Sequence, residues 1–149
     1  MIIRENRTLP RSVMDKIPEL TARVSGEPDV AAFFLFGSAA MGKLTPLSDL
    51  DFALLLSFGM SKAERFSRRL ALEGILTGLL GTDEIDVIVL NDCPPRMAHR
   101  ILKEGKLLYC GDREVFSEYY DQIVRVHLDF TFFRDNFDRV FVQGIKGRG

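Results

Sequence analysis

The chain has 149 residues, a length that suits one domain with its own hydrophobic core. Its 20 basic and 21 acidic residues leave a net charge of −1, which argues against a protein that mainly tracks a nucleic-acid backbone. The two cysteines, Cys93 and Cys110, lack the spacing of a zinc motif or of a secreted disulfide framework. No apolar run approaches the ~18 residues of a membrane span, and residues 1–10 do not resemble a signal peptide, so we expect a cytoplasmic protein.

The first half of the chain predicts one helix and two strands. The helix is expected to be interrupted at Pro18 and to end near Gly26. The apolar run 31–36 predicts a buried strand, and a short helical turn is expected after Ser38. A second strand is predicted at 49–56.

Capping signals divide the middle of the chain. Ser61 followed three residues later by Glu64 is the signature of a capping box, and Gly81 ends the helix that it opens. Residues 84–90 predict a third strand, and Pro94 and Pro95 precede a helix at 96–104. The helix and its exit carry a basic cluster that we expect to be a solvated face: Arg96, His99, Arg100, Lys103 and Lys106.

The C-terminal part predicts a short edge strand at 106–109 and then a long helix at about 112–141, followed by a flexible tail at 143–149. Apolar side chains follow heptad spacing along the helix: Phe116, Tyr119, Ile123, Val126, Phe130, Phe133, Phe137 and Val140. The first half of this stripe is expected to pack on the domain, and the second half either to pack or to dock a partner. The chain is therefore predicted to be a single α/β domain, residues 1–149, with a small mixed sheet flanked by helices.

Carboxylates in two predicted strands point to a metal site. Asp49 and Asp51 are two residues apart, so their side chains leave one face of a strand while Leu50 and Phe52 leave the other. Carboxylates that close repel each other unless a cation lies between them. With neither His nor Cys beside them, these hard oxygen ligands favour Mg²⁺ or Mn²⁺ over zinc. Asp86, between apolar β-branched residues, would complete a two-metal site.

Gly37 and Ser38 end the first predicted strand and suit phosphate binding. Without a Cβ at Gly37, backbone N–H groups can approach an anion, and the Ser38 hydroxyl can donate to a phosphate oxygen. Each of these signals alone is more typical of an ordinary strand-ending glycine or surface acid. Together they supply a phosphate grip, metal ligands and a third acid, which indicates a nucleotide site.

The segment GSAAMGKLTPLSDLD is similar to the GS-x10-D-x-D signature of the DNA polymerase β-like nucleotidyltransferase superfamily. With the third acid in EIDVIVL and the long C-terminal helix, the chain resembles the minimal nucleotidyltransferase branch. That resemblance implies a short mixed sheet flanked by helices, and Asp49, Asp51 and Asp86 as catalytic and metal-binding residues. It also implies ATP as nucleotide donor, held through Gly37 and Ser38.

Members of this branch commonly pair with a HEPN-domain ribonuclease toxin as its antitoxin, some by transferring AMP from ATP to a toxin tyrosine. The resemblance thus implies a hetero-oligomer with such a toxin, with no membrane and no direct nucleic-acid partner. Many relatives carry arginine where this chain has Ala39 and again near Met41, and Lys43 could supply charge from the same loop.

Two alternative functions fit the same sequence. One is an antitoxin that masks its toxin by contact without catalysis, which the departures at Ala39 and Met41 favour. The other is nucleotide transfer to a small hydroxylated molecule such as an aminoglycoside, although that reaction usually needs a larger substrate domain.

Overall fold

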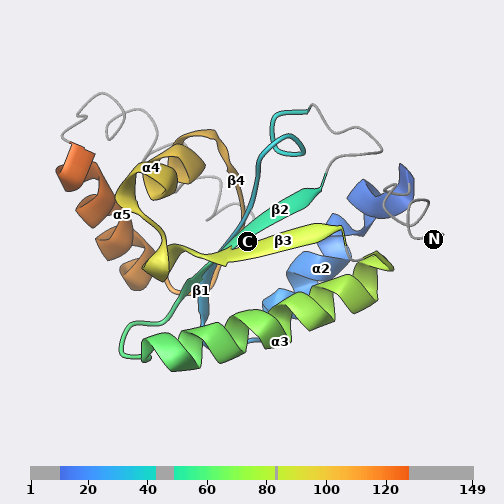
Figure 1. Ribbon diagram of the computed structural model, residues 1–149, viewed down its shortest axis with the longest axis horizontal. Coiled ribbons are helices and arrows are strands. Elements are labelled where there is room, and N and C mark those ends of the chain that lie inside the picture. Colours follow the sequence, from blue (N-terminus) through green and yellow to red (C-terminus); the bar gives the residue numbers. More distant parts are fainter. Residues whose placement is uncertain (1–10, 43–48, 83, 128–149) are drawn as a thin grey trace.

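The computed structural model describes residues 11–42, 49–82 and 84–127 (Figure 1). The elements in chain order are η1 (Arg11–Lys16), α2 (Ile17–Val24), β1 (Val30–Phe36), β2 (Leu50–Leu56), α3 (Lys62–Leu80), β3 (Ile85–Val89), η2 (Leu90–Asp92), α4 (Pro95–Glu104), β4 (Lys106–Cys110) and α5 (Arg113–His127). None of the helices in these ranges combines the length and apolar character needed to cross a bilayer.

The four strands form one mixed sheet in the order β3-β2-β1-β4. β1 is antiparallel to both β2 and β4, whereas β2 and β3 are parallel. A parallel connection requires a crossover, and α3 supplies it between β2 and β3. The expected small mixed sheet is therefore confirmed, with β4 as the predicted edge strand.

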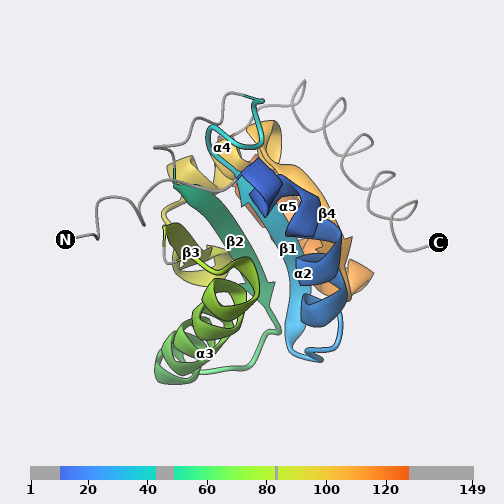
Figure 2. The ribbon, with the colours of Figure 1, turned by 90° about the vertical axis from the view of Figure 1, so that its right-hand side faces the viewer.

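Helices cover both faces of the sheet. α2 and α3 pack on one face and α4 and α5 on the other, so that the sheet lies between two helical layers (Figures 1 and 2). Along β2, Leu50, Phe52 and Leu54 face the first layer, while Ala53 and Leu55 face the second. Burial on both faces explains why the central strands read as continuous apolar runs.

The predicted capping box of α3 is present. The Glu64 N–H donates to the Ser61 hydroxyl at 3.1 Å, and the Ser61 N–H donates to the Glu64 carboxylate at 2.7 Å. Gly81 ends the helix with φ of 72°, a left-handed conformation that glycine adopts without steric strain. The Asp112 carboxylate likewise accepts from the Val115 N–H at 3.1 Å and so caps α5 as predicted.

Three local predictions need correction. Pro18 does not interrupt α2 but lies in its first turn, where the missing N–H has no intrahelical partner to lose. Residues 37–42 form turns rather than a helical turn, although the Met41 N–H donates to the Gly37 carbonyl at 3.2 Å. Asp49 precedes β2 instead of lying within it.

In the C-terminal part, α5 is described to His127. The predicted continuation to 141, with the second half of its aromatic stripe, and the tail at 143–149 lie outside the described residues. The first half of the stripe packs as expected, since Phe116, Tyr119 and Ile123 are buried in the core of the α4 and α5 layer. Val126 is 60% exposed, so the buried stripe ends there in the described part of the helix.

Candidate active site

The predicted acids lie where the end of β1 meets the starts of β2 and β3. Strand register places Asp51 opposite Phe36 on β1 and opposite Asp86 on β3. Asp51 shares its strand face with Ala53, so its carboxylate leaves on the α4 side of the sheet. Asp49, just ahead of β2, and Asp86 are exposed, whereas Asp51 is partly buried. The sheet thus brings Asp51 and Asp86 together although they are 35 positions apart in sequence.

Asp51 lies in an unusual electrostatic environment. Burial of its carboxyl, together with the negative charges of Asp86 and then Asp49, raises its pKa from 3.8 to about 6. The folded protein therefore disfavours the ionised form of Asp51 when nothing offsets the charge. A divalent cation shared by these carboxylates would remove that penalty.

The backbone of Gly37 lies directly against this carboxylate. A Cβ at residue 37 would come within 2.2 Å of the Asp51 Oδ2 atom and 3.2 Å of its Cγ atom. Gly37 also has φ of +76°, a region in which side chains are strained. Glycine is required here both for the turn and for the close approach, so the Gly-Ser loop and the acids form one site.

A hollow of about 500 Å³ lies between this loop and α4. Phe36, Gly37, Ser38 and Met41 line it from the β1 end. Arg100 comes from α4 to line the opposite wall. The Gly-Ser turn therefore borders this hollow, and backbone N–H groups of such turns can bind anions.

Arg100 is a candidate functional residue that the sequence alone did not identify. It was predicted to belong to a solvated basic face, and it is indeed exposed, with one long ion pair to Glu104 at 3.5 Å. The structure adds that it faces the Gly-Ser loop across the hollow. More than 60 residues separate the two in sequence, so no local pattern could have joined them.

The two departures from the family pattern have different structural settings. Ala39 is 4% exposed and packs into the core beneath α2 and α3, whereas Met41 is 48% exposed and lines the hollow. The side chain of an arginine at position 39 would therefore begin inside the hydrophobic core. Lys43 lies outside the described residues. Among the lysine and arginine side chains that the structure describes, the one that lines the hollow beside the loop is Arg100.

The donor set of this site suits Mg²⁺ or Mn²⁺. Asp51 and Asp86 offer adjacent carboxylates from one sheet face, and the raised pKa of Asp51 marks a position where a cation is stabilising. Within residues 11–42, 49–82 and 84–127, no group of three or more His, Cys, Asp or Glu side chains is arranged to hold a metal ion as it stands. The pair fits a metal, and Asp49 is close enough for its charge to act on Asp51.

Comparison with known proteins confirms the predicted family. Residues 19–114 match the family model "Polymerase beta, Nucleotidyltransferase". The chain belongs to this nucleotidyltransferase family. The matched region contains the five predicted site residues: Gly37, Ser38, Asp49, Asp51 and Asp86.

Among individual proteins, the nucleotidyltransferase is homologous to the protein adenylyltransferase MntA of Aphanizomenon flos-aquae (strain 2012/KM1/D3). The two are 30% identical over 129 residues, which cover 82% of this chain and 78% of MntA.

Solved structures share the fold of the nucleotidyltransferase. A toxin-antitoxin complex with AMP-PNP has a chain that matches at 18% identity and a TM-score of 0.58, covering 89% of this chain and 97% of that one. A chain from a complex of tri-AMPylated Shewanella oneidensis HEPN toxin with MNT antitoxin matches at 18% identity and a TM-score of 0.52, covering 90% and 96%. These likenesses confirm the predicted mixed sheet flanked by helices.

Proposed function

We propose that this nucleotidyltransferase is an antitoxin that transfers AMP from ATP to a tyrosine of a HEPN-domain toxin, with which it forms a hetero-oligomer. The observation that carries the proposal is the close approach of the Gly37 backbone to the Asp51 carboxylate. Asp51 is in register with Asp86 on β3, and the chain is a homologue of the protein adenylyltransferase MntA. This contact joins a phosphate-binding loop to a pair of carboxylates, the two parts that nucleotide transfer needs.

In the proposed mechanism, backbone N–H groups after Gly37 and the Ser38 hydroxyl donate to the β,γ-phosphates of ATP. Asp49, Asp51 and Asp86 would hold Mg²⁺ or Mn²⁺, which when bound neutralises triphosphate charge and lowers the pKa of the acceptor hydroxyl. Asp86, the more exposed of the two acids in register, would accept the acceptor's proton. The acceptor oxygen then attacks the α-phosphorus, the bond to the β-phosphate bridging oxygen breaks, and pyrophosphate leaves.

The direct test is to incubate the chain with ATP labelled at the α-phosphate, Mg²⁺ and the HEPN toxin proposed as its partner. We expect label on a toxin tyrosine, and no label when EDTA replaces Mg²⁺. A tight complex that neutralises the toxin without label would instead establish masking by contact. Label on an aminoglycoside but not on the toxin would establish the small-molecule alternative.

Arg100 should supply part of the positive charge that the Gly-Ser loop lacks at Ala39 and Met41. We expect Arg100→Ala to raise the KM for ATP by about five- to tenfold, the size of one partly exposed charge contact, with a smaller change in kcat. Arg96→Ala is a matched control, because Arg96 belongs to the same basic cluster but does not line the hollow. An unchanged KM in Arg100→Ala, or an equal rise in both variants, would contradict this role.

A further inference from the structure

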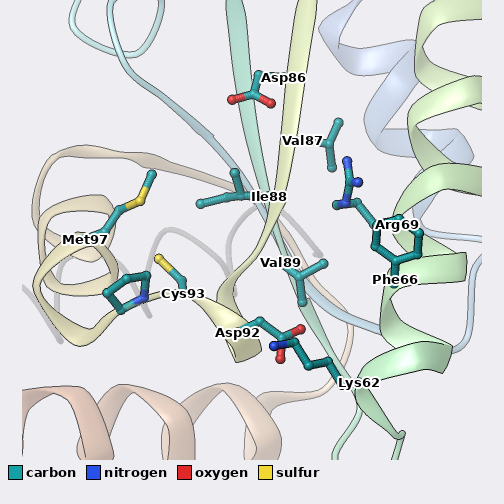
Figure 3. Close-up of a pocket in the computed structure, with 11 residues that line it drawn as sticks. Lys62, Phe66, Arg69, Asp86, Val87, Ile88, Val89, Asp92, Cys93 and Met97 are labelled. Atoms are coloured by element: carbon teal, nitrogen blue, oxygen red, sulfur yellow. The ribbon is translucent and has the colours of Figure 1, made fainter.

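A second hollow includes Asp86 and adjoins the first hollow at Met97, which lines both. It is a groove of about 430 Å³ between α3 and α4, along the outer edge of β3 (Figure 3). Phe66 on α3 and Met97 on α4 stand on its two walls, and β3 residues 87–89 form its floor. Asp86 lines one end. The groove therefore leads directly to a proposed catalytic acid.

The floor of the groove is an open strand edge. β3 ends the sheet, so within the described residues no strand neighbours its outer edge. The Leu50 N–H donates to the Glu84 carbonyl at 3.1 Å, which fixes the direction of the backbone at Glu84 toward β2. Alternate residues of a strand direct their backbone N–H and C=O groups to opposite sides. The backbone groups of Asp86 therefore also point toward β2, whereas those of Val87 and Val89 point outward into the groove.

The walls of the groove present an apolar anchor. Phe66 is 55% exposed and Met97 is 39% exposed. Large apolar side chains that are exposed beside an open strand edge favour association with another chain. The guanidinium of Arg69 lies over the Phe66 ring at 5.2 Å, and Arg69 is itself paired with Glu73 at 2.9 Å. These contacts orient the exposed ring beside the strand edge before any partner binds.

We propose that an extended segment of the protein substrate adds to the outer edge of β3 as an extra strand, packs against Phe66, and so delivers its acceptor hydroxyl to Asp86. This inference rests on the proposed AMP transfer and specifies how the acceptor binds. The occupant follows from continuity with the site, because Asp86 is both a site acid and the end of the groove. The hollow beside Gly37 and Ser38 is lined by other residues, apart from Met97, and is left for the triphosphate.

Substitution of Phe66 tests the apolar anchor. We expect Phe66→Ser to raise the KM for the toxin by about tenfold or more, as loss of an aromatic anchor does, while ATP binding measured by calorimetry stays unchanged. Leu70→Ser is the matched control, since Leu70 lies one turn further along α3 with a similar exposure of 50% but does not line the groove. Equal toxin KM values for wild type and Phe66→Ser would overturn the proposal.

Amide hydrogen exchange tests the strand addition without requiring catalysis. We expect the Val87 and Val89 amides to exchange rapidly in the free chain and to become protected in the complex with the toxin. Unchanged exchange in the complex, or slow exchange already in the free chain, would overturn the pairing. If the wild-type chain transferred no AMP, the proposed function would fail in the labelling assay, whereas the exchange result would still decide whether the groove docks the toxin.

Discussion

Replacing Asp51 by asparagine is expected to reduce AMP transfer by roughly two to three orders of magnitude while making the metal-free protein more stable at pH 8. Transfer falls because the substitution removes the negative charge of Asp51, which lies between the Gly37 backbone and Asp86. An amide there is a weaker ligand for a divalent cation and offsets none of its charge.

The gain in stability follows from the pKa of Asp51, which its surroundings raise from 3.8 to about 6. The folded protein keeps this proton over a pH range in which the unfolded chain has released it. The free energy of unfolding therefore falls as the pH rises from about 4 to about 6, and below that range the carboxyl is protonated in both states. Because the side chain is partly exposed, we expect the full penalty to be about 1–2 kcal/mol, present at pH 8 and absent near pH 4.

Urea unfolding in EDTA at pH 4 and pH 8 would measure this effect. Asp51→Asn should match the wild type at pH 4 and exceed it at pH 8, and added Mg²⁺ should stabilise the wild type more than the variant. Asp15→Asn, the same change at an exposed carboxyl of η1, should alter neither stability nor transfer. Equal stability of wild type and Asp51→Asn at pH 8 would mean that the three acids do not strain the folded state.

Gly37→Ala is expected to reduce AMP transfer by roughly a hundredfold with only a modest loss of stability. The added Cβ would lie 2.2 Å from the Asp51 Oδ2 atom, so the carboxylate must move by about 1 Å or more. Since that atom is the end of a side chain that can rotate, the fold can accommodate the change, but Asp51 then leaves its position beside Asp86. The positive φ of residue 37 adds a strain of about 1–2 kcal/mol.

Gly42→Ala separates these two effects. Gly42 has a similar φ of +73°, but a Cβ there would meet no atom of the described residues within 4 Å. We therefore expect similar losses in the free energy of unfolding for Gly37→Ala and Gly42→Ala, and a large loss of transfer in Gly37→Ala alone. Chemical denaturation and the labelled ATP assay would measure both quantities. Equal transfer by the two variants would show that the close contact with Asp51 has no role in the reaction.

Much of the fold could be predicted because its signals are local. The capping box at Ser61 and the glycine at 81 place the ends of α3, since both act within a few residues of the helix terminus. Asp49 was misplaced inside a strand for a related reason. The D-x-D spacing shows which residues share a face of an extended chain, but it does not show where pairing with the neighbouring strands begins.

The candidate site was predicted in its residue types but not in its internal differences. The spacing treats the acids alike, whereas the structure makes Asp51 partly buried and leaves Asp49 and Asp86 exposed. That difference arises from the position of Asp51 on an inner strand, between β1 and β3, against the Gly37 backbone. Desolvation depends on this packing, so the raised pKa of Asp51 could not be derived from sequence.

The sequence by itself predicted the candidate site residues and most of the strands and helices. These features depend on residue type and on interactions between near neighbours in the chain. The tertiary structure decided which of those side chains meet: the parallel register that sets Asp51 beside Asp86, the approach of Arg100 to the Gly-Ser loop, and the open β3 edge beside Phe66. Those contacts follow from burying both faces of the sheet under separate helical layers, a constraint that acts on the whole chain at once.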